Sequence, residues 1–220
     1  KLRTLLSLLG ITIGIFAIIS VFTVIDSLER YIRESLNALG SNMVYIQKWP
    51  WAPPEGETEY PWWKYMNRPV TDLDETSELL RRSKLTGEGV FFFGFQRTIQ
   101  YENNTAENTE ILATSFELLE VWNLKIEQGR YFSESEMSSG APVALIGSEL
   151  ASQLFPSVNP VGKSFKVQGH RLLVIGVYEK TGQDMFGTSM DKRVHLPVNY
   201  AFSMVDVRNR DYGQTICVKS

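Results

Sequence analysis

The chain has 220 residues and a formal net charge of −3, from 22 Lys and Arg against 25 Asp and Glu. This mildly acidic balance argues against nucleic acid as a partner. A single cysteine excludes an internal disulfide, and the aromatic, Gly and Pro contents are those of an ordinary globular protein.

The first element is an uncharged apolar run from Leu5 to Ile25. Its length matches the ~20 helical residues that cross a hydrocarbon core of ~30 Å. A cleaved signal peptide has a shorter apolar segment, and a helix of a soluble core seldom stays apolar on all sides for this length. The run is therefore predicted to be a retained transmembrane helix in contact with membrane lipid.

The charges at its two ends predict the orientation of this helix. Lys1 and Arg3 precede the apolar run, whereas the residues after it mix both signs. By the positive-inside rule, the amino terminus is cytoplasmic and the chain is exported from about residue 26 onward. The exported part has a net charge of about −5, which argues against a basic membrane-binding patch.

Small residues recur within the apolar run, at Ser7, Gly10, Gly14 and Ala17. A stripe of small residues lets the backbone of another membrane helix approach closely. Partner helices are one interpretation; the other is that Gly and Ser are simply common in membrane helices.

Asp26 to Leu39 continues as an amphipathic helix. Its apolar positions are Leu28, Ile32, Leu36 and Leu39, and Gly40 is the expected C-terminal glycine. A single apolar stripe on a helix that leaves the membrane predicts a stalk. Either a second helix covers this stripe, or the stripe packs on the exported domain of its own chain.

Short apolar runs and helical spacing predict the elements of the exported part. Strands are expected at Met43–Gln47, Thr98–Tyr101, Glu110–Thr114, Val143–Gly147, Phe165–Val167, Leu172–Tyr178, Val194–Leu196 and Thr215–Val218, and helices at Thr71–Ser83, Phe116–Val121 and Ser148–Phe155. Thr71, followed by Asp74 and Glu75, is the expected cap of the first of these helices. The irregular alternation indicates an α+β fold.

Residues 49–63 are rich in Trp and Pro, with Trp49, Trp51, Trp62 and Trp63 among them. Pro blocks helices and central strands, so the segment is expected to be an ordered loop or arm. Its aromatic side chains could pin the loop to its own domain, form a docking surface for a partner, or meet lipid headgroups.

The sequence predicts no catalytic, cofactor-binding or metal-binding residue. His170 and His195 lie in strand-like surroundings without the neighbours of a metal site, and Cys217 fits a small buried side chain. Phosphate-loop and nucleophile-elbow motifs are absent from the sequence. A membrane-anchored enzyme is therefore disfavoured.

An ordered series of segments runs along nearly the whole chain: LRTLLSLLGITIGIFAIISV, LNALGSNMVYIQ, RPVTDLD, EQGRYFSESEM, PVALIGSELASQLFPSVNPVGKSFKVQGHRLLVIGVYEK and VHLPVNYA. Together they resemble the MacB-like ABC transporter permease family. The residues that fit its pattern are Gly129, Arg130, Phe132, Gly147, Leu154, Phe155, Pro160, Gly162, Lys163, Gly176 and Val177. The Trp- and Pro-rich segment departs from the pattern as an insertion.

The resemblance implies a fold and a division into domains. Residues 1–40 would form the first membrane helix and stalk. Residues 41–108 and 193–220 would form a porter-like α+β subdomain, and residues 109–192 an inserted, mostly β subdomain. Further membrane helices would follow residue 220, and the location would be the bacterial inner membrane with a periplasmic domain.

The resemblance also implies partners and a function. Such permeases pair with a second permease, identical or paralogous, and bind a cytoplasmic ABC ATPase; some use a periplasmic adaptor and an outer-membrane channel. The ATPase drives motion that reaches the periplasm for export of an antibiotic, peptide or lipoprotein. The alternative is an FtsX-like transmitter that transports nothing and regulates an envelope enzyme.

Among the residues that carry the resemblance, Gly129, Gly147, Gly162 and Gly176 are expected at element ends, where a positive φ or a close backbone approach is needed. Arg130 is expected to pair with Glu134 or Glu136, or to stack on Tyr131. These residues therefore predict maintenance of the fold rather than contact with a substrate.

Overall fold

The computed structural model describes the backbone of residues 2–38, 43–56, 59–83, 87–182, 189–207 and 211–219, and, within the first helix, the side chains of residues 9–31. The chain forms two compact units, Lys1–Ser41 and Asn42–Ser220. The elements are α1 (Leu2–Ala38), β1 (Met43–Gln47), α2 (Trp62–Tyr65), α3 (Leu73–Arg82), β2 (Glu88–Tyr101), β3 (Asn104–Thr114), α4 (Leu118–Val121), β4 (Ile126–Gly129), α5 (Glu134–Ser139), β5 (Val143–Ile146), α6 (Ser148–Leu154), β6 (Ser164–Val167), β7 (His170–Tyr178), η1 (Met190–Lys192), β8 (Val194–Pro197), α7 (Val198–Ala201) and β9 (Thr215–Lys219).

Helix α1 is unbroken over 37 residues, which corresponds to about 55 Å at helical rise. Its segment Leu9–Tyr31 is long and apolar enough to cross a membrane, with a mean hydropathy of 2.2 and no part buried. The predicted continuation beyond Ile25 is confirmed as far as Ala38. The predicted end at Leu39 and Gly40 lies outside the described residues.

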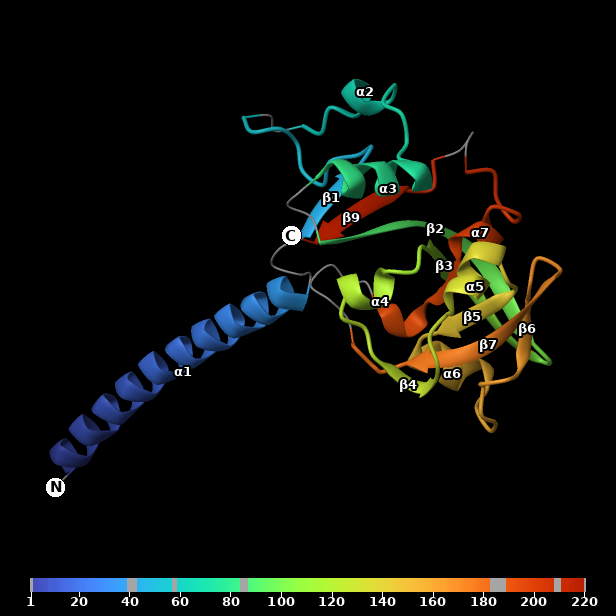
Figure 1. The fold of residues 1–220 in the computed structure, drawn as a ribbon. Coiled ribbons are helices and arrows are strands. Elements are labelled where there is room, and N and C mark those ends of the chain that lie inside the picture. Colours follow the sequence, from blue (N-terminus) through green and yellow to red (C-terminus); the bar gives the residue numbers. More distant parts are fainter. Residues whose placement is uncertain are drawn as a thin grey trace. The chain divides into compact units, whose positions relative to one another are not determined.

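The second unit is built on one nine-stranded sheet in the order β1-β9-β2-β3-β8-β5-β7-β4, with β6 pairing β2 and β7 beside this path. The pairs β3·β8 and β5·β7 are parallel, and the other pairs are antiparallel. Strands β1 and β2 run in the same direction with β9 between them, and α3 connects them, which is a split βαβ unit (Figure 1). The predicted α+β class is confirmed.

Strand β2 is central to the core because both of its faces are covered in its first half. Phe91, Phe93 and Phe95 belong to the largest apolar cluster, which includes side chains from β3, β5, β6, β7 and β8. On the opposite face, Val90 packs with side chains of α4 and with Cys217 of β9. Burial on both faces explains why this strand lacks the alternation typical of a half-exposed strand.

The predicted strands all lie within observed strands or within one residue of them. Five short elements were not predicted: α2, β4, α5, η1 and α7. β4 (Ile126–Gly129) has only one side chain that is not exposed, and α5 (Glu134–Ser139) buries only Met137. Neither segment has an apolar periodicity, although the spacing of Ser133 and Glu136 in the sequence is that of a capping box. In the structure these two residues do form that box.

The cap of α3 is one residue later than predicted. Asp72, and not Thr71, is the N-cap, and the Glu75 side chain accepts a hydrogen bond from the Asp72 backbone N–H to complete a capping box. The hydroxyl of Thr71 is buried and has no hydrogen-bond partner among the described residues. Aspartate is a better N-cap than threonine, and its spacing to Glu75 is the one that the box requires.

Three glycines of the signature, Gly129, Gly147 and Gly176, lie where no side chain fits. A Cβ on Gly129, which has φ +81, would lie 2.2 Å from the carbonyl oxygen of Ile175 on the neighbouring strand. A Cβ on Gly147 would lie 2.3 Å from the backbone of Asp191. A Cβ on Gly176 would lie 2.7 Å from the carbonyl oxygen of Arg130. These close approaches confirm the structural role of the three glycines, although Gly176 lies inside β7 and not at an element end as expected.

The predicted division of the exported part into two subdomains stays a prediction. Its boundary at residues 108 and 109 falls inside β3, and its boundary at residues 192 and 193 falls between η1 and β8.

Candidate functional site

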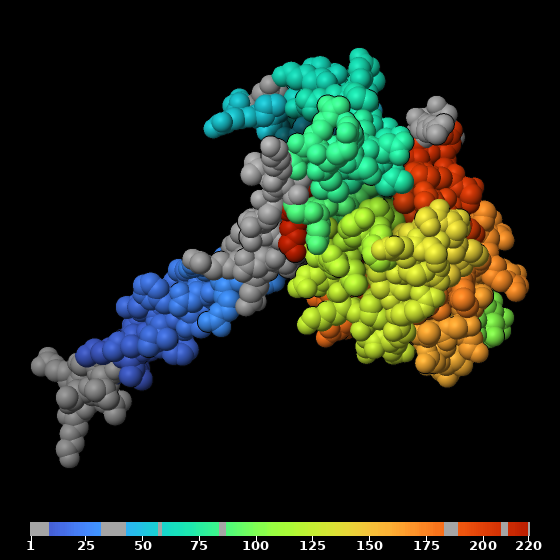
Figure 2. Space-filling model, viewed as in Figure 1, coloured from blue at the N-terminus to red at the C-terminus, as the bar shows by residue number. Residues whose placement is uncertain are grey.

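The described residues 49–56 and 59–68 form an arm between β1 and α3, here named the aromatic arm (Figures 1 and 2). Three polar contacts hold its base and its loop. The Trp49 indole N–H donates to Asp211 at 2.6 Å, and the Lys48 ammonium lies 3.7 Å from the same carboxylate. The Tyr60 hydroxyl donates to the carbonyl of Pro50 at 2.8 Å, which closes the intervening loop.

Tyr65 is the buried centre of the aromatic arm. The ring of Tyr60 lies 5.7 Å from its centroid and the ring of Trp49 lies 6.5 Å away, in an edge-on arrangement. The Arg68 guanidinium covers the ring at 4.4 Å, within cation–π distance. These side-chain contacts hold the arm in place, although its only regular element is the short helix α2.

The four Trp residues predicted as a docking surface divide into two groups. Trp49 is half-buried in the base of the arm, whereas Trp51, Trp62 and Trp63 are exposed, together with Met66. The Trp62 and Trp63 rings meet edge to face at 5.9 Å, and Trp51 leans on Tyr45 of β1 at 4.8 Å. Trp49 therefore pins the arm to its own domain, and docking by the other three stays a prediction.

The predicted small-residue stripe lies on the surface of α1. Gly10, Gly14 and Ala17 are exposed, and a Cβ on either glycine would meet no atom within 4 Å outside the helix's own backbone. The side chain of Ser7 lies outside the described residues. Contact of this stripe with another helix stays a prediction.

Of the predicted stalk stripe, only Leu28 has a described side chain, and it is exposed. The side chains of Ile32 and Leu36, and the whole of Leu39, lie outside the described residues. Covering of the stripe by a second helix therefore also stays a prediction.

A groove of about 610 Å³ lies over β2 and β3. Gly94 opens its floor, since a Cβ there would touch the Glu110 carboxylate at 3.5 Å. Glu110 accepts a hydrogen bond from the Arg193 Nε at 2.8 Å, and this ion pair joins β3 to the start of β8. The Glu110 carboxylate is thus engaged in holding the sheet together.

The two histidines have structural surroundings. His195 is fully buried, its Nδ1 lies 3.0 Å from the Tyr178 hydroxyl, and burial lowers its pKa to about 3, with Arg193 adding to the effect. His170 is half-buried, and its Nδ1 lies 3.1 Å from the Tyr200 hydroxyl. No group of three His, Cys, Asp or Glu side chains that could hold a metal ion occurs in the described ranges.

Cys217 is buried, as predicted, with its thiol 3.7 Å from the Met43 sulfur. Burial raises the pKa of this thiol, so the thiolate required for nucleophilic chemistry is disfavoured.

Arg130 pairs with Glu136, one of its predicted partners. The guanidinium donates to both carboxylate oxygens, at 2.6 and 2.7 Å, and its hydrogen bond holds the pKa of Glu136 at about 2. Because Glu136 also completes the capping box of α5, Arg130 ties the end of β4 to this helix. The pair therefore maintains the fold, as the sequence predicts.

The sequence of residues 4–220 matches the family described as the MacB-like periplasmic core domain. The chain belongs to this family. The resemblance to MacB-like ABC transporter permeases is thereby confirmed, and it extends over the apolar helix as well as the folded domain.

Proteins similar to this MacB-like chain include export permeases. It is 28% identical to the macrolide export ATP-binding/permease protein MacB of Nitrobacter winogradskyi, over 90% of the chain and 29% of that protein. It is 26% identical to the pyoverdine export ATP-binding/permease protein PvdT of Pseudomonas aeruginosa, over 96% of the chain and 30% of that protein. The chain thus spans about a third or less of these curated relatives.

Solved structures of related domains share the fold. The periplasmic region of MacB from Actinobacillus actinomycetemcomitans has a TM-score of 0.64 at 14% identity, over 84% of this chain and 77% of that one. The extracellular domain of the noncanonic ABC-type transporter YknZ from Gram-positive bacteria has a TM-score of 0.58 at 19% identity, over 81% and 83% of the two chains. At these identities the likeness shows the fold alone.

Proposed function

We propose that this chain is the first membrane helix and the exported core domain of an ABC transporter permease. The observation that carries the proposal is the family match over residues 4–220, which includes the apolar helix and the domain together. The amino terminus would be cytoplasmic, and the domain would lie on the outer side of the cytoplasmic membrane, in the periplasm where the host has one.

The proposed role of the chain is mechanical. Helix α1 continues without interruption from the candidate span Leu9–Tyr31 to Ala38. A continuous helix of about 55 Å transmits displacement along its axis better than a flexible linker. Motion caused by ATP in a cytoplasmic ATPase, separate or fused, would thus reach the exported domain.

We propose export or efflux of an antibiotic, a peptide or a lipoprotein as the resulting activity. The support is that two similar proteins are named as export permeases for macrolides and for pyoverdine. A periplasmic adaptor and an outer-membrane channel belong to the same proposal.

The second candidate is a transmitter that moves no substrate and regulates an envelope enzyme. One solved relative is described as a noncanonic ABC-type transporter.

Deletion and complementation test the choice between the two candidates. Loss of the gene in its host should lower tolerance to a transported compound, and restoration of this permease with its ATPase should reduce accumulation of that compound in the cells. Unchanged accumulation together with altered cell-wall turnover would contradict export and favour the transmitter.

A further inference from the structure

The exposed apolar surface of the aromatic arm is formed by Trp51, Trp62, Trp63 and Met66, which are 66%, 55%, 55% and 53% exposed. A Trp side chain presents up to about 250 Å². These four residues therefore leave on the order of 500 Å² of largely apolar area uncovered on one short segment. Apolar patches of this size on a folded surface usually mark an interaction site.

The aromatic arm is ordered before it meets any partner. Its indoles project from a segment that is fixed by the buried ring of Tyr65, by the Tyr60 hydroxyl on Pro50 and by the Trp49 indole on Asp211. Rigid aromatic side chains lose little conformational entropy when they bind, which is typical of the anchor residues of protein interfaces.

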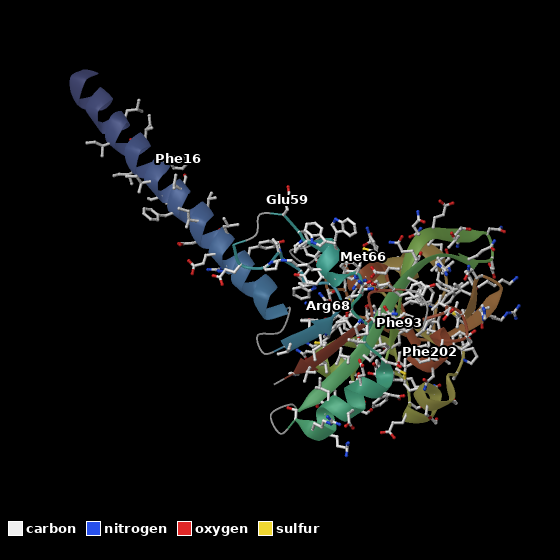
Figure 3. The ribbon with its side chains drawn as sticks, turned by 90° about the horizontal axis from the view of Figure 1, so that it is seen from above. Phe16, Glu59, Met66, Arg68, Phe93 and Phe202 are labelled. Atoms are coloured by element: carbon white, nitrogen blue, oxygen red, sulfur yellow. The ribbon has the colours of Figure 1, made fainter. Side chains whose placement is uncertain are left out.

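The charges of the arm divide into two halves. The exposed acidic residues Glu55 and Glu59 precede the Trp62–Trp63 pair, and the exposed basic residues Lys64 and Arg68 follow it. In Figure 3, Glu59 lies at the outer part of the arm and Arg68 lies closer to the sheet. In chain order the arm is thus acidic before the Trp62–Trp63 pair and basic after it.

We propose that the aromatic arm of one copy docks on the aromatic arm of a second copy of this chain. A two-fold axis brings identical patches together, so the acidic half of each arm meets the basic half of the other. The indoles and Met66 of both arms then cover each other at the centre. The segment 49–68 carries a net charge of −1, from Glu55, Glu57 and Glu59 against Lys64 and Arg68, whereas an anionic lipid surface would favour a net basic patch.

The size of the patch predicts how strong the contact is. Two arms would bury on the order of 1,000 Å², which is the lower limit for a specific interface. Such a contact is weak between soluble domains but becomes populated when both copies are held in one membrane by their helices. The inference rests on the proposed function only in that two permease copies lie side by side.

Cysteine cross-linking of the full permease in its own membrane tests the contact. The native Cys217 is buried and its pKa is raised, so introduced cysteines are selective probes. Asn67→Cys places a probe beside Met66, Gln153→Cys is a matched exposed control on α6, and Ala17→Cys reports pairing through the membrane helix. We expect dimers from Asn67→Cys at a yield at least five-fold above that from Gln153→Cys.

Substitutions in the Asn67→Cys background then test the proposed chemistry. Trp62→Ser with Trp63→Ser should lower dimer yield at least five-fold and leave Ala17→Cys cross-linking unchanged, whereas Phe at both positions should retain most of the yield. Glu55→Lys with Glu59→Lys, and Lys64→Glu with Arg68→Glu, should each lose self-cross-linking. A mixture of these two charge variants should recover it, because opposite halves then attract; recovery also shows that both variants fold.

The outcomes separate this contact from the proposed function. Cross-linking through Ala17→Cys without Asn67→Cys dimers would overturn the arm contact and leave the paired permease standing. Absence of both would contradict the pairing itself. The arm contact would also be overturned if the Trp and charge substitutions left the yield of Asn67→Cys dimers unchanged. Cross-links from Asn67→Cys to a different protein, in place of dimers, would overturn it as well.

Discussion

The signature residues of this domain serve its packing and hydrogen bonding. Gly147 approaches the backbone of Asp191, and Asp191 in turn accepts hydrogen bonds from the N–H groups of Thr181 and Gly182 at 2.9 and 2.8 Å. The Asp191 carboxylate therefore closes the ends of the connection between β7 and β8. The sequence pattern indicated that Gly147 was structural, but the identity of its neighbour depends on a contact more than 40 residues away.

Gly147→Ala should destabilise the domain by about 2–4 kcal/mol, because the new Cβ overlaps the Asp191 backbone. Gly94→Ala is the matched control, since its Cβ would lie no closer than 3.5 Å to any neighbouring atom. It should change stability by less than about 1 kcal/mol. Urea unfolding of residues 42–220 measures both; equal stability of the two variants would refute the close-packing argument.

His195 should make the domain less stable as pH falls. Burial lowers its folded pKa to about 3, whereas the unfolded chain takes up the proton near pH 6.5, so this stability is present above pH 6.5 and is lost progressively toward pH 3. The slope is about 1.4 kcal/mol per pH unit in this window. Unfolding of His195→Gln between pH 7 and 5 should lack this component, and an identical slope in both proteins would contradict it.

At the scale of elements, prediction succeeded where burial follows a simple period. β1 matches its predicted bounds, and α3, α4 and α6 each lie within a predicted helix. The first half of β2 was missed because both of its faces are buried, so apolar residues follow one another without alternation.

The arm shows the limit of local patterns most clearly. All four Trp residues lie in one Trp- and Pro-rich segment, yet Trp49 is fixed by Asp211, which is 162 residues away in the sequence. Only the folded chain could therefore separate the structural indole from the three exposed ones.

The N-cap of α3 provides a direct test at this scale. Asp72→Ala should cost about 1 kcal/mol of stability, because it removes the capping box with Glu75. Thr71→Ala should cost less, since the Thr71 hydroxyl has no hydrogen-bond partner among the described residues. Thermal unfolding measures the stability of both variants. A larger loss of stability for Thr71→Ala would indicate that Thr71 is the N-cap, as the sequence predicts.

At the scale of the whole molecule, the sequence indicated the membrane helix and the family, and the comparisons confirm the family over residues 4–220. Composition and periodicity alone could not give the function, since the sequence contains no recognisable catalytic motif. The proposed transmission therefore requires that α1 act as a stiff connection between the membrane and the exported domain.

The connection between α1 and the exported domain can be altered without substituting any residue of α1 or of the domain. A flexible Gly-Ser insertion after Ala38 should uncouple the two while leaving ATP hydrolysis by the ATPase intact, because such linkers behave as random coils. The matched control is an insertion of the same length after Gln168 in the β6–β7 turn, which lies away from α1 in the chain.

The most direct measurement is the distance between spin labels at Gln153→Cys in two paired permeases, in lipid nanodiscs with their ATPase. ATP trapped by vanadate should shift this distance in the intact protein and in the control insertion. The shift should disappear in the protein with the Gly-Ser insertion after Ala38. An ATP-dependent shift that survives this insertion, or no shift in the intact protein, would contradict transmission through α1.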